Sequence, residues 1–145
     1  MIERIAIVIV LATLVVVVSL VVRSVARQRA AAAAGQALPE ELRERFPTGE
    51  PGIVYFYGPH CAFCRQQAAI LDRLSVEDGV AVIRVDATSN TGLADALGIM
   101  TVPSTVVVDG SGTVRSVNLG LCSRNALLLQ LGEPVDRPAN LTASG

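Results

Sequence analysis

Residues 53–64 read IVYFYGPHCAFC, and this stretch decides the fold expected for the chain. Its first part, Ile53 to Tyr57, is an apolar run of strand length that is rich in residues favoured in β-strands. Gly58 and Pro59 then form a turn. From Cys61 to Leu74 the apolar residues recur on one helical face, which indicates an amphipathic helix. The stretch therefore predicts a strand, a turn and a helix that begins at a pair of cysteines.

The two cysteines, Cys61 and Cys64, have the spacing of a redox pair. Unpaired backbone N–H groups and the helix dipole favour an anion at a helix N-terminus, so they lower the pKa of the first thiol. The offset of three residues brings both sulfurs onto one helical face, within reach of a disulfide. Zinc sites and structural disulfides also use C-x-x-C, but the strand-turn-helix context and the lack of a second C-x-x-C in the sequence favour redox chemistry. We expect Cys61 to attack and Cys64 to resolve.

Further elements surround this unit. Upstream, Pro39 opens a short helix that ends in the turn formers of residues 47–52. Downstream, the pattern predicts strands at Val80–Val85, Thr105–Val108 and Val114–Asn118, a helix at Asn90–Leu97, and a last helix capped by Ser123. The order is β-α-β-α-β-β-α. This alternation implies parallel pairing in the first half and an antiparallel hairpin at the end.

The N-terminal region has the composition of a membrane anchor. Ile5 to Val22 carries no charged residue, and at 1.5 Å per residue it reaches about 27 Å, which nearly spans a bilayer core. A cleaved signal peptide is the alternative, since Ala30 to Ala34 could imitate a cleavage site. However, the apolar run is longer than the apolar region of a signal peptide, which usually has about 7–15 residues. Arginines also separate the run from those alanines. We expect an uncleaved, single-pass anchor in the cell membrane.

The charges beside this segment bear on its orientation. Arg23, Arg27 and Arg29 follow it, whereas Arg4, offset by Glu3, precedes it. The positive-inside rule therefore favours a domain on the cytoplasmic face. A short N-terminal tail gives the rule little to count, so an outward-facing domain is the alternative.

The chain accordingly divides into four parts. They are an anchor with an Arg-rich flank at 1–29, an Ala-rich linker at 30–37, a folded domain at 38–132 and a loose tail at 133–145. The chain has a net charge of −1, 3% aromatic residues and no basic stripe, which argues against a nucleic-acid partner.

From Leu38 to Leu131 the chain resembles the thioredoxin-like family. The matching stretches are 53–64, Val85-Asp86 and 98–104, which reads GIMTVPS. The resemblance implies an α/β, three-layer sandwich, in which helices flank a central mixed sheet of about four strands. Here one transmembrane helix precedes it.

The same resemblance assigns a second wall to the site. It implies that the Val102-Pro103 bond is cis and that Pro103 faces the disulfide. The exposed backbone of Val102 would then pair with a substrate segment by strand addition.

Two positions depart from the family pattern beneath the cysteines. Tyr55 stands where thioredoxins bury an acidic residue, and Val82 stands where they place its lysine partner. Their joint absence is physically consistent, because either charge buried alone would be costly. Water, the substrate or the Tyr55 hydroxyl would then accept the proton of the resolving thiol.

Two further departures lie beside the nucleophile. Ala62 and Phe63 separate the cysteines, and without a histidine between them we expect a reducing to intermediate potential. His60 replaces the usual tryptophan, where its cation could stabilise the Cys61 thiolate. A rim histidine without effect is the alternative reading. We expect His60 and Phe63 to contribute to the substrate-binding wall formed by Val102 and Pro103.

The third cysteine, Cys122, precedes the capping Ser123. Its side chain can pack on Leu127 as a hydrophobic staple. The family resemblance also places this segment near the rim of the disulfide, so an accessory exchanging thiol is the alternative.

These observations predict a membrane-tethered thiol-disulfide oxidoreductase that exchanges its Cys61/Cys64 pair with protein thiols and needs no cofactor beyond that disulfide. Its partners would be protein thiol or disulfide substrates and an upstream dithiol donor or acceptor. On the cytoplasmic side it would act as a reductant. Facing outward, it could reduce apocytochrome cysteines or oxidise and isomerise secreted proteins.

A copper- or zinc-binding module is the alternative function, with Cys61, Cys64 and either His60 or Cys122 as ligands. The cysteines of thioredoxin-like copper chaperones are usually spaced more widely, and their histidine lies far downstream, where this chain has none. An inactive scaffold is disfavoured because both cysteines are retained beside the expected cis-proline.

Overall fold

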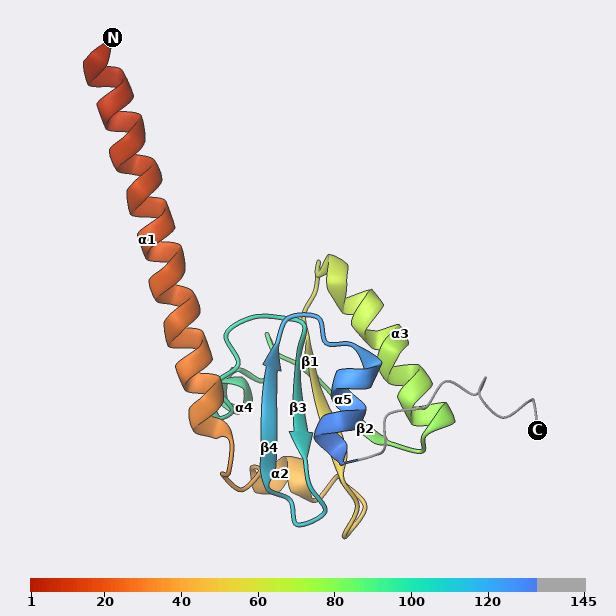
Figure 1. Cartoon of the computed structure of the whole chain (residues 1–145). Helices are drawn as coiled ribbons and strands as arrows, with labels where there is room; N and C mark the ends of the chain where they lie inside the picture. The colour runs from red at the N-terminus through yellow and green to blue at the C-terminus, as the bar shows by residue number, and fades with distance from the viewer. Residues whose placement is uncertain (133–145) are drawn as a thin grey trace, which may run out of the picture.

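A computed structural model describes residues 1–132 of the chain. The segment 133–145, expected from the sequence to be a loose tail, lies outside the described residues. The described part consists of a long N-terminal helix and a domain built on one sheet (Figure 1).

The sheet has four strands in the order β2-β1-β3-β4. Their bounds are Gly52–Tyr57 for β1, Ala81–Asp86 for β2, Ser104–Val108 for β3 and Val114–Leu119 for β4. β1 pairs with β2 in parallel and with β3 antiparallel, and β4 is antiparallel to β3. The mixed sheet of four strands expected from the sequence is confirmed.

The direction of β3 differs from what simple alternation of strands and helices suggests. Residues 87–103 connect β2 to β3 and contain one short helix, α4 (Thr91–Ala96). β3 starts at the end of the sheet where β2 stops, because Ser104 pairs with Phe56. The loop of residues 98–103 therefore lies at the end of the sheet where β1 leads to the cysteines.

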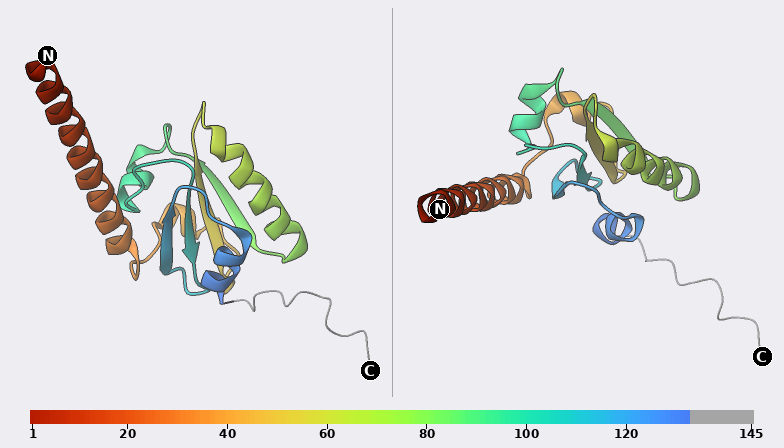
Figure 2. Two further views of the ribbon diagram at one scale, coloured as in Figure 1. Left: turned by 45° about the horizontal axis from the view of Figure 1, so that its top comes forward. Right: turned by 90° about the horizontal axis from the view of Figure 1, so that it is seen from above.

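Helices cover both faces of the sheet, giving three layers (Figure 2). The remaining helices are α1 (Ile2–Ala33), α2 (Glu40–Arg43), α3 (Ala62–Glu77) and α5 (Arg124–Leu131). Side chains alternate along β1, so Ile53 and Tyr55 pack with α3 and α5, whereas Val54 and Phe56 pack with α2 and α4. Both faces of β1 are buried, which explains its continuous apolar sequence.

The long helix α1 runs without a break from the apolar segment into the alanine-rich stretch expected to be a linker. It has a mean hydropathy of 3.4 in its most apolar window and is long and apolar enough to cross a membrane. Its last turns contact the domain, because Ala30 and Ala33 are buried. Beyond the helix, the Gly35 N–H donates to the Val114 carbonyl at 2.7 Å, and the Val114 N–H donates to the Gln36 carbonyl at 2.8 Å.

Candidate active site

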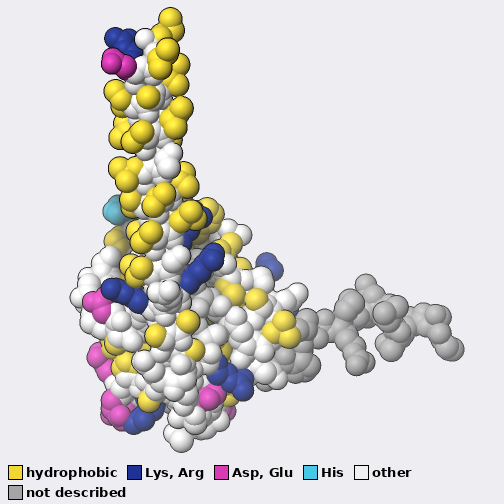
Figure 3. Space-filling view, turned by 60° about the vertical axis from the view of Figure 1, so that its left-hand side comes forward, with side chains coloured by type: hydrophobic (Ala, Val, Ile, Leu, Met, Phe, Trp, Pro, Cys, Tyr) yellow, Lys and Arg dark blue, Asp and Glu magenta, His cyan; other side chains and the backbone are white. Residues whose placement is uncertain are grey.

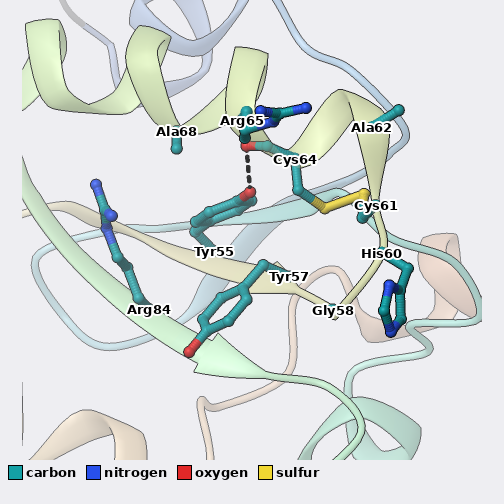
Figure 4. A pocket seen from close by; sticks show the side chains of 10 residues that line it. All are labelled: Tyr55, Tyr57, Gly58, His60, Cys61, Ala62, Cys64, Arg65, Ala68 and Arg84. Carbon is teal, nitrogen blue, oxygen red and sulfur yellow. Dashed lines mark hydrogen bonds between the residues drawn. A yellow bond between two sulfur atoms is a disulfide. The ribbon is translucent and has the colours of Figure 1, made fainter.

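Cys61 and Cys64 form a disulfide at the start of α3 (Figure 4). Cys61 occupies the N-cap position and Cys64 lies in the first turn, with Cα atoms 5.3 Å apart. Cys64 is buried with 7% of its surface exposed, whereas Cys61 is only half-buried. Cys61 is therefore the more accessible of the two cysteines, and the attacking role expected for it stays a prediction.

The first turn of α3 is suited to stabilise a thiolate at Cys61. The helix has 16 residues and carries no acidic side chain in that turn. Its unpaired N–H groups and its dipole therefore stabilise a negative charge on the N-cap sulfur, and no carboxylate in that turn counteracts them. Reduction of the disulfide leaves Cys61 in a position that favours the ionised, nucleophilic form.

The loop before β3 is the segment predicted to form the second wall of the site. The Val102-Pro103 peptide bond is cis, as the family resemblance implies, and Pro103 is buried. Its carbonyl accepts a hydrogen bond from the Gly120 N–H at 2.8 Å. A Cβ on Gly58 would lie 3.2 Å from Val102 Cγ2, so Val102 packs against the turn that leads to Cys61.

Tyr55 fills the space beneath the cysteines where thioredoxins have a buried acid. Its hydroxyl donates to the Cys64 carbonyl at 2.7 Å (Figure 4). Burial raises the pKa of Tyr55, so the phenol keeps its proton at neutral pH. Tyr55 is thus a hydrogen-bond donor to the backbone of Cys64 and not a base at neutral pH.

Water has a route to this position through an open cleft of about 810 Å³ beside the disulfide. Tyr55 and Tyr57 form part of its wall, with ring centroids 5.9 Å apart. Arg65 and Arg84 line it as well (Figure 4), and Arg84 is paired with Asp72.

The two predicted wall residues on the outer side of the site are both exposed. His60 lines the cleft in a left-handed backbone conformation, with φ of 60°, and its ring points away from the disulfide (Figure 4). Phe63 is 62% exposed. Val102 and Cys61 pack against the same buried cluster, which contains Cys64, whereas His60 and Phe63 lie on the exposed rim. That Pro103 faces the disulfide stays a prediction.

Cys122 is buried and is not part of a disulfide. It lies in the same buried cluster as Cys64 and Leu127. This position favours the packing role over the role of an accessory exchanging thiol. Burial raises the pKa of its thiol. A native thiol of this kind is a poor nucleophile at neutral pH.

One residue of the site was missed by sequence reasoning. Gln67 is fully buried, and its amide holds both backbone groups of Cys122. The Cys122 N–H donates to Gln67 Oε1 at 2.7 Å, and Gln67 Nε2 donates to the Cys122 carbonyl at 3.2 Å. Its position in the sequence could have revealed this role. Gln67 is a polar residue three positions after Cys64, and it lies on the same helical face as Leu71 and Leu74.

Within residues 1–132, no group of three or more His, Cys, Asp or Glu side chains is placed to hold a metal ion. The observed partner of each active-site cysteine is the other cysteine. No structural observation favours the metal-binding alternative.

Known proteins with a similar sequence or structure have the same type of fold. The chain is 29% identical over 90 residues to a protein disulfide-isomerase of Medicago sativa, and it spans 17% of the length of that relative. A Fasciola hepatica thioredoxin superposes with a TM-score of 0.55 at 22% identity, covering 64% of this chain and 88% of its own. MTB dsbF superposes with a TM-score of 0.51 at 17% identity, covering 59% and 81%.

These structures establish a thioredoxin-like fold. The family described as "TraF: F plasmid transfer operon protein" matches residues 22–131, which is most of the chain. This protein therefore belongs to the TraF family and carries its thioredoxin-like domain behind a long apolar helix.

Proposed function

We propose that this protein is a membrane-tethered thiol-disulfide oxidoreductase that exchanges the Cys61–Cys64 disulfide with thiols of other proteins. The observation that carries the proposal is the disulfide at the start of α3, in which Cys61 is more exposed than Cys64, beside a loop with a cis bond before Pro103. The two cysteines carry the electrons themselves, so the proposed reaction needs no cofactor.

The oxidising direction proceeds in two exchanges. A substrate thiolate attacks Cys61 Sγ, the Cys61–Cys64 bond breaks, and Cys64 leaves as a thiolate that takes a proton from water in the cleft. A second substrate thiolate then attacks the substrate sulfur of the mixed disulfide and expels Cys61 as a thiolate. The substrate loses two electrons and gains a disulfide, while the protein becomes a dithiol. The reducing direction is the reverse of these steps.

The surrounding residues support this sequence of events. The N-terminus of α3 stabilises the Cys61 thiolate when it leaves. In this proposal the backbone of Val102 pairs with an extended substrate segment, which would align the substrate sulfur with Cys61.

Tethering is supported by α1, whose apolar segment is exposed throughout and is followed by three arginines. The arginines favour a cytoplasmic domain. A membrane-impermeant thiol reagent applied to intact cells tests the side. Labelling of reduced Cys61 only after lysis supports the cytoplasmic face, and labelling before lysis places the domain outside.

Trapping of mixed disulfides tests the exchange reaction. Cys64→Ser removes the resolving thiol, so it should accumulate a protein adduct on Cys61. Cys61→Ser removes the exposed sulfur and should accumulate none, and Cys122→Ser serves as the matched control. Equal trapping by Cys64→Ser and Cys61→Ser would contradict the assignment of roles.

A further inference from the structure

The last turns of α1 are docked on the domain, so the direction of the helix fixes the orientation of the active site. Ala30 and Ala33 are buried at this junction. A Cβ on Gly98 would lie only 2.6 Å from the Arg29 carbonyl oxygen and 3.0 Å from the Ala30 nitrogen. Two backbones thus meet without a side chain between them, and backbone hydrogen bonds tie the following residues to Val114. A junction of this kind holds the helix and the domain in one relative orientation.

This junction also lies close to the active-site wall. Gly98 begins the loop that contains Val102, and four peptide units of about 3.5 Å limit their separation to roughly 14 Å. Along the helix, Arg29 lies about 9 Å beyond Arg23, which ends the apolar run. The wall of the site is therefore within roughly 30 Å of the level at which α1 would leave the membrane.

The figures show in which direction the site faces. α3 begins, and the loop before β3 turns, at the end of the domain from which the apolar part of α1 rises (Figures 1 and 2). In the space-filling view, the cyan histidine side chain stands at this end of the domain (Figure 3). The opposite end of the sheet, with the β3–β4 turn, faces away from that segment.

The same end of the domain carries three exposed apolar side chains, here called the apolar rim. They are Phe63, Met100 and Leu121, which are 62%, 46% and 45% exposed. They come from three separate segments at this end of the domain, which are the first turn of α3, the loop before β3 and the residues after β4. The hydrogen bond from the Gly120 N–H to the Pro103 carbonyl joins the last two segments. Large apolar side chains at one end of a soluble domain are suited to a membrane interface or to an apolar partner.

We infer that the disulfide faces the bilayer surface and that its redox partner is an integral membrane protein that presents a cysteine pair there. This inference rests on the proposed function. The docked helix α1 ends at Ala33, which is 11 residues beyond Val22, the last residue of the apolar run. The space between the active-site end of the domain and the lipid headgroups is therefore small for a large soluble protein. A cysteine pair carried at the membrane surface needs no such room. Transfer is the exchange described above, with the partner dithiol oxidised as the Cys61–Cys64 bond is reduced, or the reverse.

The orientation is tested by fluorescence, with a readout that does not depend on redox activity. The chain contains no tryptophan, so Phe63→Trp and Val76→Trp are single reporters at the two ends of α3. In liposomes that contain brominated lipids, we expect quenching of the Phe63→Trp emission and none for Val76→Trp. Equal quenching of both, or stronger quenching of Val76→Trp, would overturn the orientation.

The partner class is tested by moving the domain away from the bilayer. Seven helical residues inserted after Arg23 lengthen α1 by about 10 Å and nearly preserve its facing direction. Two probes carry the same Cys-x-x-Cys dithiol: a transmembrane peptide that presents it at the bilayer surface, and a soluble peptide. The insertion should slow exchange with the membrane probe at least about tenfold and leave the soluble probe within about twofold.

Equal effects of the insertion on the two probes would overturn the inference while leaving the proposed function intact. Failure of the wild-type protein to exchange with either probe would refute the proposed function itself, and the inference with it.

Discussion

Replacement of Gly98 by alanine tests the docking of α1 on the domain, which determines where the active site faces. Gly98 has φ of +69°, and Gly79 has nearly the same value, +67°. An alanine in this left-handed region costs about 1–2 kcal/mol at either position. Nothing lies within 4 Å of a Cβ at Gly79, so Gly79→Ala is the matched control.

At Gly98 a second cost is added. The new methyl group would lie 2.6 Å from the Arg29 carbonyl oxygen and 2.7 Å from its carbon. These are backbone atoms of a helix, so they cannot rotate away, and overpacking of this kind costs about 1–3 kcal/mol. We therefore expect Gly98→Ala to lower the free energy of unfolding by about 2–5 kcal/mol, against about 1–2 kcal/mol for Gly79→Ala.

Urea unfolding of the full-length protein in detergent, followed by circular dichroism, measures both values. If Gly98→Ala instead relieves the clash by releasing the helix, trypsin should cleave after Arg29 faster than in the wild type or in Gly79→Ala. Equal loss of stability in the two variants, together with unchanged cleavage after Arg29, would refute the docked arrangement.

Three further outcomes are expected. Tyr55→Phe removes the 2.7 Å hydrogen bond to the Cys64 carbonyl and should cost about 0.5–1.5 kcal/mol in urea unfolding. The phenol of Tyr55 is not a base, so the exchange rate should fall by less than about tenfold, and a larger loss would restore a proton-transfer role. Because burial raises the pKa of Cys122, the oxidised protein should lose stability as the pH rises above 9.0, where the thiol of the unfolded chain ionises first. Urea unfolding at pH 7.5 and about pH 10 should show a smaller loss in Cys122→Ala, and an unchanged loss would argue against this origin. Leu71→Ala empties a fully buried position and should cost about 2–5 kcal/mol, whereas Val76→Ala, on the exposed side of the same helix, should cost less than about 0.5 kcal/mol.

Much of the site could be predicted from residues 53–64. The strand, the turn and the helix follow one another in that stretch, so local spacing determines that both cysteines lie at a helix start. The cis bond before Pro103 came from the family resemblance, because no local pattern distinguishes it from an ordinary loop proline.

Other features depend on contacts between distant segments. The antiparallel direction of β3 is set by its pairing with β1, which lies about 50 residues earlier in the chain, and no local pattern reports that pairing. The hydrogen bonds of Gln67 join residues 55 positions apart. The sequence predicts an Ala-rich linker at 30–37, but small side chains also permit close helix packing, and Gly98 supplies the complementary surface.

The central claim is that the Cys61–Cys64 pair transfers oxidising equivalents, and transfer to a dithiol peptide tests it most directly. Purified, oxidised full-length protein is mixed with the reduced peptide, and free thiols on both are alkylated and counted by mass spectrometry. We expect one peptide disulfide to form for each Cys61–Cys64 bond that opens, with Cys122 unchanged in its alkylation. A Cys61–Cys64 disulfide that dithiothreitol opens, but that transfers nothing to the peptide at any pH between about 6 and 9, would contradict the account.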